Sequence, residues 1–116
     1  MPTGTLERPQ SETQYGSSSQ VATGLRVFFP EMTQEQYEIV MDVVDIEVDP
    51  PEGLVFHSAG PVEGGWLITD IWESRDAFDR YAEERSGAAF AMVIEHGLPA
   101  LNQPEITEFA VYNYIK

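Results

Sequence analysis

Apolar and polar residues alternate along four stretches of the chain with the period of two that is typical of β-strands. Glycine, proline or acidic residues that favour turns flank these stretches. The pattern therefore predicts strands over residues 22–29, 54–60, 65–72 and 105–115. Only the short link "PVEG" separates the second stretch from the third, so we expect these two strands to form an antiparallel hairpin.

The spacing of apolar residues changes to that of a helix after the first strand. Thr33 is followed by Gln36 three positions later, which is the pattern of a capping box at a helix start. An apolar face then recurs at helical spacing and is opposed by an acidic face. The pattern predicts a helix that ends near Asp45, before the rigid turn "DPPEG".

A second helical region follows the third strand. Ser74 is placed to cap it, and Asp76 and Arg80 are spaced to pair on its surface. We expect Gly87 to break this helix. A second helical piece, "AAFAMVIEHG", then closes at Gly97.

The order of these elements is strand, helix, strand, strand, helix, strand. Right-handed crossovers turn that order into a four-stranded antiparallel sheet with both helices on one face, the ferredoxin-like arrangement of the α+β class. Residues 1–20 are polar and poor in aliphatic side chains, so we expect a disordered or loosely packed tail. Residues 21–116 are expected to form a single domain.

Both faces of the predicted sheet are apolar. On the third strand Leu67 and Ile71 alternate with Trp66, Ile68 and Trp72, and the last strand follows the same pattern. The helices cover only one face, so a monomer would expose a large apolar patch, which soluble proteins avoid. We therefore expect a two-fold homodimer that packs sheet against sheet.

Acidic residues dominate the charge of the chain. Twenty Asp and Glu against six Lys and Arg give a net charge of −14. This charge repels nucleic acid and anionic membrane surfaces, so neither is expected as a partner. The stretch from Glu31 to Glu52 holds eight acids and no base, and their spread favours a solvated surface over a docking face for a cationic partner or metal.

The inventory of residues narrows the chemistry further. Without cysteine there is no disulfide and no thiolate metal site. The two histidines lie in distant segments and no glycine-rich phosphate loop is present, so neither a metal nor a cofactor is expected. No apolar run is long enough to span a membrane and the N-terminus lacks the pattern of a signal peptide, which makes the cytoplasm the expected location.

His57 and Asp70 are the candidate catalytic residues. Histidine titrates near neutral pH, so His57 is the best general base in the chain. Asp70 is a carboxylate among bulky apolar neighbours, which is costly unless it is paired. It can orient His57 if the hairpin register puts both on one face, and the link leaves that register open. The alternatives are a histidine bonded at the sheet surface or dimer seam, and a carboxylate that reaches a backbone amide, Arg26 or solvent.

The candidate substrate-binding residues are aromatic. Two share the strand parity of Asp70, two lie on the inward faces of the predicted helices, and one lies on the first strand: they are Trp66, Trp72, Tyr37, Tyr81 and Phe28. Together they can line an aromatic pocket with one acidic group. Core packing is the alternative for each of them, most of all for Trp72 against the second helical region.

Three segments together carry a resemblance to a known family: "MTQEQYEIV", the hairpin through "DIWESRDAFDRY", and "PEITEFAVYNYI". They resemble the dimeric α/β-barrel superfamily, and within it the small antibiotic-biosynthesis-monooxygenase-type proteins of actinobacteria. The resemblance spans residues 23–115 and implies the ferredoxin-like fold and the dimer. The superfamily includes cofactor-free monooxygenases, polyketide cyclases and haem-degrading enzymes, and none of their catalytic residues can be matched by position to this chain.

Two functions follow as hypotheses from the residues and the resemblance. The first is a small enzyme of specialised metabolism that deprotonates an aromatic or polyketide-type molecule, as in cofactor-independent monooxygenation or cyclisation. The second is a non-catalytic, small-molecule-binding or stress-associated dimer of the same fold. The sequence leaves open whether the protein is an enzyme.

Overall fold

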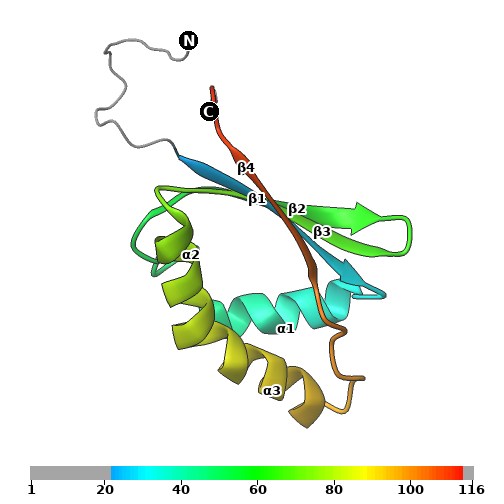
Figure 1. Cartoon of the computed structure of the whole chain (residues 1–116). Helices are drawn as coiled ribbons and strands as arrows, with labels where there is room; N and C mark the ends of the chain where they lie inside the picture. The colour runs from blue at the N-terminus through cyan, green and yellow to red at the C-terminus, as the bar shows by residue number, and fades with distance from the viewer. Residues whose placement is uncertain (1–21, 114–116) are drawn as a thin grey trace, which may run out of the picture.

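The computed structural model describes residues 22–113 and shows an antiparallel sheet with all of its helices on one face (Figure 1). The predicted tail, residues 1–20, lies outside the described residues. In chain order the elements are β1 (Thr23–Pro30), α1 (Gln34–Val44), β2 (Leu54–Val62), β3 (Gly65–Trp72), α2 (Arg75–Tyr81), a π-helical turn η1 (Ala82–Ser86), α3 (Gly87–Glu95) and β4 (Glu105–Ala110).

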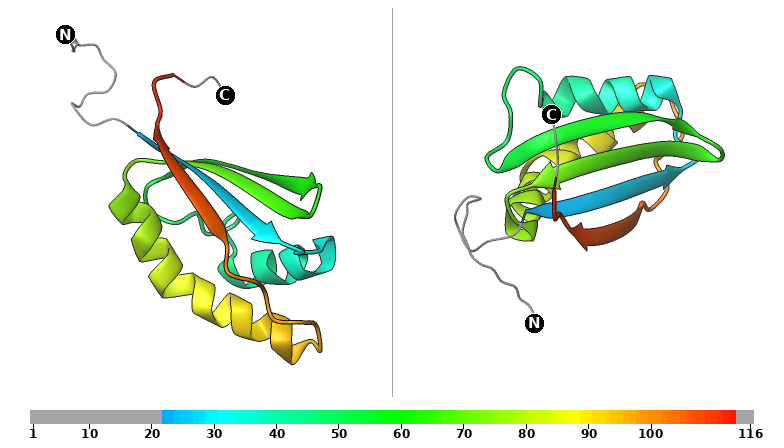
Figure 2. Two further views of the ribbon diagram at one scale, coloured as in Figure 1. Left: turned by 45° about the vertical axis from the view of Figure 1, so that its right-hand side comes forward. Right: turned by 90° about the horizontal axis from the view of Figure 1, so that it is seen from above.

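The sheet has the strand order β2-β3-β1-β4, in which every neighbouring pair is antiparallel. This order and the helical layer on one face confirm the predicted ferredoxin-like fold. The strands lie side by side in that order in Figure 2, with β2 and β4 at the two edges. The site described below lies at the β2 edge, where α1 passes beneath the sheet.

Polar caps fix the helix starts where the sequence predicts them. The Thr33 hydroxyl accepts a hydrogen bond from the Gln36 amide at 3.1 Å, and the Gln36 side chain accepts one from the Thr33 amide at 2.8 Å. Ser74 accepts a hydrogen bond from the amide of Ala77 at 3.1 Å. The predicted end of α1 is also confirmed, because Asp45 takes the left-handed conformation with φ of 54°. Both helices therefore begin at positions set by local chemistry.

The second helical region departs from the prediction at Gly87. Its backbone stays helical there, with φ of −61°, and α2, η1 and α3 follow one another without a break. Gly87 has no neighbour that a side chain would meet, and glycine in a helix is only mildly unfavourable. The predicted Asp76–Arg80 pair is likewise corrected: Arg75 pairs with Asp79 instead, at 2.9 Å. In residues 22–113 no helix is both long and apolar enough to cross a membrane.

Two strand ends also differ from the prediction. β2 continues through Pro61 to Val62, because an edge strand tolerates a residue without an amide hydrogen. β4 ends at Ala110, which pairs with Thr23 at the start of β1. Past that point one further backbone hydrogen bond, from the Val111 amide to the Ala22 carbonyl at 2.9 Å, joins the two segments. Residues 114 and 115 of the predicted strand lie outside the described residues.

The core lies between the sheet and the helices. It is built on the inward positions of β1 and β3, with one residue from the β1–α1 turn and one from α2: Leu25, Val27, Phe29, Met32, Trp66, Trp72 and Ala77. A second cluster, Val44, Ile46 and Ala89, packs α1 against α3. One polar residue of the sheet, Asp70, is buried on this inner face with them. Its burial directs attention to the side chains around it.

Candidate active site

His57 and Asp70 face one another across the β2–β3 hairpin. They are paired in register, and Nδ1 of His57 lies 2.7 Å from Oδ1 of Asp70. The His57 side chain is 19% exposed and the Asp70 side chain 7%. The pair sits on the inner face of the sheet at its β2 edge, with the imidazole partly exposed and the carboxylate buried.

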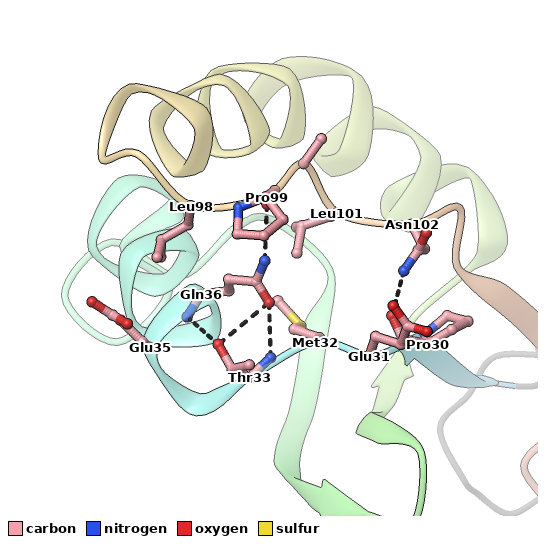
Figure 3. A pocket seen from close by; sticks show the side chains of 11 residues that line it. Pro30, Glu31, Met32, Thr33, Glu35, Gln36, Leu98, Pro99, Leu101 and Asn102 are labelled. Carbon is pink, nitrogen blue, oxygen red and sulfur yellow. Dashed lines mark hydrogen bonds between the residues drawn. The ribbon is translucent and has the colours of Figure 1, made fainter.

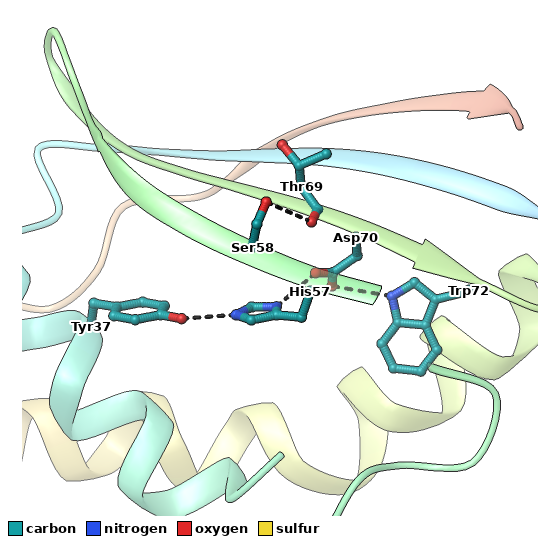
Figure 4. Close-up of polar contacts among 6 residues, drawn as sticks. All are labelled: Tyr37, His57, Ser58, Thr69, Asp70 and Trp72. Atoms are coloured by element: carbon teal, nitrogen blue, oxygen red, sulfur yellow. Dashed lines mark hydrogen bonds and ion pairs between the residues drawn. The ribbon is translucent and has the colours of Figure 1, made fainter. Parts of the chain in front are cut away.

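Both oxygens of the Asp70 carboxylate have hydrogen-bond donors. Oδ1 faces His57, and Oδ2 accepts a hydrogen bond of 3.1 Å from the indole N–H of Trp72 (Figure 4). A carboxylate accepts hydrogen bonds and donates none, so Nδ1 of His57 carries the hydrogen in this pair. In the neutral imidazole Nε2 is then left as an acceptor, the form that a general base requires.

Tyr37 completes a line of hydrogen bonds with its phenolic oxygen 2.8 Å from Nε2 of His57. The Tyr37 and His57 rings lie within 2° of parallel and meet end to end, as Figure 4 shows. The α1 cap places Tyr37, whose amide donates to the Thr33 carbonyl at 3.0 Å. Burial raises the pKa of the Tyr37 phenol, and the nearby Asp70 charge raises it further. Tyr37 is therefore a hydrogen-bond donor at neutral pH.

Two further aromatic side chains surround this line. Trp66 stacks on Tyr37, with ring centroids 5.1 Å apart and planes 28° apart. Tyr81 lies against Trp72 at 5.2 Å. Burial raises the pKa of Tyr81 to about 12, helped by the Asp70 charge. The hydroxyls of Tyr37 and Tyr81 are therefore both protonated at neutral pH, and the negative charge in this group of side chains is that of Asp70.

Comparison with known proteins finds similar folds among solved structures. No family model and no curated protein matches the sequence. Among solved structures, SnoaB from Streptomyces nogalater, a cofactor-independent oxygenase, is 16% identical with a TM-score of 0.56, over 84% of this chain and 98% of that one. A monooxygenase from the Streptomyces coelicolor gene ActVA-Orf6, in complex with nanaomycin D, is 16% identical with a TM-score of 0.51, over 83% and 91%.

A third structure, from Deinococcus radiodurans, is a proposed antibiotic biosynthesis monooxygenase. It is 12% identical with a TM-score of 0.54, and the match covers 82% of this chain and 96% of that one. This chain has the fold of the antibiotic-biosynthesis-monooxygenase-like proteins. At such low identities the likeness concerns the fold, so the chemistry has to be argued from the site of this chain itself.

The structure brings together most of the residues that the sequence singles out. His57, Asp70, Tyr37, Trp66 and Trp72 form one connected group on the inner face, and Tyr81 borders it through Trp72. Trp72 is 1% exposed, packs on Phe78 and Tyr81, and lies in the core.

The sequence suggested the pairing of His57 with Asp70 but missed two hydrogen bonds, one from Tyr37 to His57 and one from Trp72 to Asp70. The signal for the second was available, since Trp72 and Asp70 are two apart on one strand.

The assignment of Phe28 to this site is corrected by the strand pairing. Leu25, Val27 and Phe29 alternate inward on β1, so Phe28 lies on the opposite, outer face of the sheet. There it is paired with Leu67 and lies near the hairpin glycine Gly65. Phe28 therefore cannot contact a molecule held by His57.

A separate cavity of about 330 Å³ lies between the β1–α1 turn and the loop after α3 (Figure 3). Glu31, Glu35 and Leu98 are among its lining residues, and neither His57 nor Asp70 lines it. The buried carboxamide of Gln36 borders it, but its oxygen is engaged by Thr33 and its nitrogen donates to the Pro99 carbonyl at 2.9 Å. Within residues 22–113 no group of three or more His, Asp or Glu side chains is placed to hold a metal ion.

Proposed function

We propose that this protein is a small enzyme that deprotonates an aromatic or polyketide-type molecule, in the manner of a cofactor-independent monooxygenase or a cyclase. The observation that supports this is the line of hydrogen bonds from Tyr37 through His57 to Asp70. It combines a general base, a carboxylate that orients it and a phenol that donates. SnoaB is a cofactor-independent oxygenase and the ActVA-Orf6 monooxygenase is in complex with nanaomycin D, which supports an oxygenase that acts on a small molecule.

The first step is a proton transfer at Nε2 of His57. A phenolic or enolic O–H, or a C–H next to a carbonyl, takes the place of the Tyr37 hydroxyl and gives its proton to Nε2. Asp70 stabilises the imidazolium that forms, because its oxygen already faces Nδ1 at 2.7 Å. Tyr37 remains protonated and donates its hydrogen to the oxygen of the substrate anion. A positioned base of this kind contributes about 10²- to 10⁴-fold.

Two reactions can follow from the same anion. In oxygenation the anion supplies electrons to O₂, a CH₂ group becomes a carbonyl that holds one oxygen atom, and the other oxygen atom leaves as water with both hydrogens. In cyclisation the carbanion attacks a carbonyl of the same molecule, and His57 returns the proton to the alkoxide. The substrate is its own electron source in the first reaction, and no net electron transfer occurs in the second.

The edge position of β2 leaves the histidine of this site partly exposed. β2 is the outermost strand beside β3, and His57 is the member of the pair with the greater exposure. A substrate that enters from this edge would meet His57 before it meets the buried Asp70. Trp66 lies against the Tyr37 ring and forms part of the wall on that side.

The second candidate function is binding without catalysis. One observation favours it: Nε2 of His57 already has a partner in Tyr37, so the network is satisfied without a substrate. In that case the protein is a small-molecule-binding or stress-associated dimer of the same fold, and Tyr37 is a structural side chain.

We also propose that two copies pair through the outer face of the sheet. One row of this face consists of Phe56, Ile71, Gly24 and Phe109, one residue from each strand. The Phe109 ring lies directly over Gly24, where any side chain would collide with it. Phe56 and Phe109 are 39% and 41% exposed, so this row is an apolar surface that a second copy would cover.

The test is oxygen uptake and product formation with hydroxylated anthrone or quinol substrates, for wild type, His57→Ala and His96→Ala. His96 is the matched control, because it ends α3 and its ring lies 3.0 Å from the Met92 carbonyl. We expect His57→Ala to lower kcat by about 10²- to 10⁴-fold and His96→Ala to keep wild-type turnover. Binding without turnover in wild type would support the second function, and equal turnover in His57→Ala would overturn the assigned base.

A further inference from the structure

Trp66 and Trp72 lie near opposite ends of β3 on the same face of the sheet, but their indole N–H groups differ in what they contact. Both point to the inner face and both are at least nine-tenths buried. The N–H of Trp72 donates to Oδ2 of Asp70 at 3.1 Å, whereas the buried N–H of Trp66 has no hydrogen-bond partner among residues 22–113. The two tryptophans can therefore be compared directly: the indole of Trp72 donates a hydrogen bond to Asp70, and that of Trp66 contacts the site by packing alone.

The ring of Trp72 is held firmly in place. It is 1% exposed and packs edge-on against Phe78 at 5.7 Å and at a tilt against Tyr81 at 5.2 Å. Because Trp72 is held rigidly and lies two residues from Asp70 on the same strand, its N–H can donate to one particular oxygen of the carboxylate. With Oδ2 occupied by Trp72, only Oδ1 is left for His57, and the plane of the carboxylate is set by the core.

We infer that Trp72 is a positioning residue that fixes the Asp70 carboxylate and, through it, holds His57 in the form with hydrogen on Nδ1. This inference rests on the proposed function for its catalytic meaning, but the geometry it describes can be measured without any substrate. Trp72 touches neither Nε2 nor the space beside it. It acts through Asp70, because an imidazole presents Nε2 as a base only while its other nitrogen keeps the hydrogen.

The test is the ¹⁵N spectrum of the histidine rings in the full chain, which distinguishes hydrogen on Nδ1 from hydrogen on Nε2. In wild type we expect His57 to carry hydrogen on Nδ1 alone. Trp72→Phe keeps an aromatic ring but removes the N–H, and it should shift His57 to a mixture of the two forms. Trp66→Phe is the matched control: it also exchanges an indole for a phenyl ring but leaves both hydrogen bonds of Asp70, so His57 should keep its hydrogen on Nδ1. An unchanged His57 spectrum in Trp72→Phe would overturn the inference.

Asp70→Asn provides a second variant of nearly the same shape, in case Trp72→Phe does not fold. Asparagine has one acceptor oxygen and one donor NH₂. If Trp72 holds that oxygen, the NH₂ group faces His57, and the hydrogen moves to Nε2. If Trp72 does not position the residue, the amide rotates to keep its oxygen on Nδ1, and the spectrum stays that of wild type. The second result would also overturn the inference.

Turnover separates the two proposals. With an active substrate, Trp72→Phe should lower kcat by up to about 100-fold with little change in KM, since orientation and not binding is lost. The expected ¹⁵N shifts without turnover in wild type would support the positioning role and refute the proposed function. Turnover that depends on His57, with no spectral change in Trp72→Phe, would refute the positioning role alone.

Discussion

At the scale of single residues, two side chains of the same type have different roles because their contacts differ. His57, on the sheet, contacts a carboxylate and a phenol, whereas His96 contacts a backbone carbonyl at the end of α3. The carboxylate of Asp70 affects the ionisation of two neighbouring side chains. Its charge raises the pKa of both Tyr37 and Tyr81, in each case after burial as the larger cause.

Tyr81 makes the stability of the protein depend on pH in alkaline solution. Its pKa is about 12 in the folded protein, against 10.0 for an ordinary tyrosine side chain such as that of the unfolded chain. Between these values the unfolded chain loses the proton first, so the free energy of unfolding falls as pH rises from 10 towards 12. We expect a loss on the order of 2 kcal/mol over this range. Urea unfolding at pH 8, 10, 11 and 12 measures it.

Tyr81→Phe is the variant that tests this assignment, because phenylalanine keeps the ring and cannot ionise. Its free energy of unfolding should fall less steeply above pH 10 than that of wild type. Tyr112, which is 93% exposed, provides the control as Tyr112→Phe. Equal alkaline slopes for wild type and Tyr81→Phe would show that Tyr81 is not the group responsible.

At the scale of elements, the end of α1 is tied to the helical turn η1 by one arginine. Arg85 donates from Nη1 to the Val44 carbonyl at 2.6 Å and to the Asp49 carbonyl at 2.9 Å. Val44 is the last residue of α1, and the last turn of that helix has no basic side chain of its own. Arg85 therefore satisfies a helix end and joins it to the loop that leads into β2.

Arg85→Ala should lower the free energy of unfolding by about 1.5–3 kcal/mol, the range for losing hydrogen bonds to a charged donor. Arg80→Ala is the matched control. It removes the same charge from the preceding helix α2, where Arg80 borders a small surface cavity, and should change stability by less than about 0.5 kcal/mol. Chemical unfolding monitored by circular dichroism measures both, and equal losses would show that only the charge matters.

The elements also show what the sequence could predict. Thr33 and Ser74 mark helix starts because their caps are local chemistry. The helix through Gly87 was not predictable, since the packing of α3 outweighs a weak local preference.

The candidate site was likewise only partly predictable from the sequence. The hairpin pattern brought His57 near Asp70, but their direct opposition depends on β2 continuing to Val62, which leaves a two-residue turn. The bond from Tyr37 depends on how α1 lies against the sheet, which no local pattern encodes.

At the scale of the whole molecule, the outer face of the sheet and the acidic charge would have opposite effects on the stability of the proposed dimer. The apolar row that ends at Phe109 favours association, whereas each copy carries a net charge of −14. Repulsion between two such copies is screened by salt, so the dimer should tighten as ionic strength rises. Sedimentation equilibrium of the full chain at low and high salt measures this dependence.

Phe109→Asp should weaken the dimer by on the order of 100-fold or more in Kd, because an unpaired carboxylate would be buried between the two sheets. Ile94→Asp is the matched control: Ile94 lies on α3 in the helical layer, is 56% exposed and gains the same charge. If both variants dissociate equally, the added charge is the cause and the outer face is not the interface. If only Phe109→Asp is monomeric and it keeps the wild-type circular dichroism spectrum, the dimer is held by the sheet. The His57 sites on the two inner faces are then free to open towards solvent.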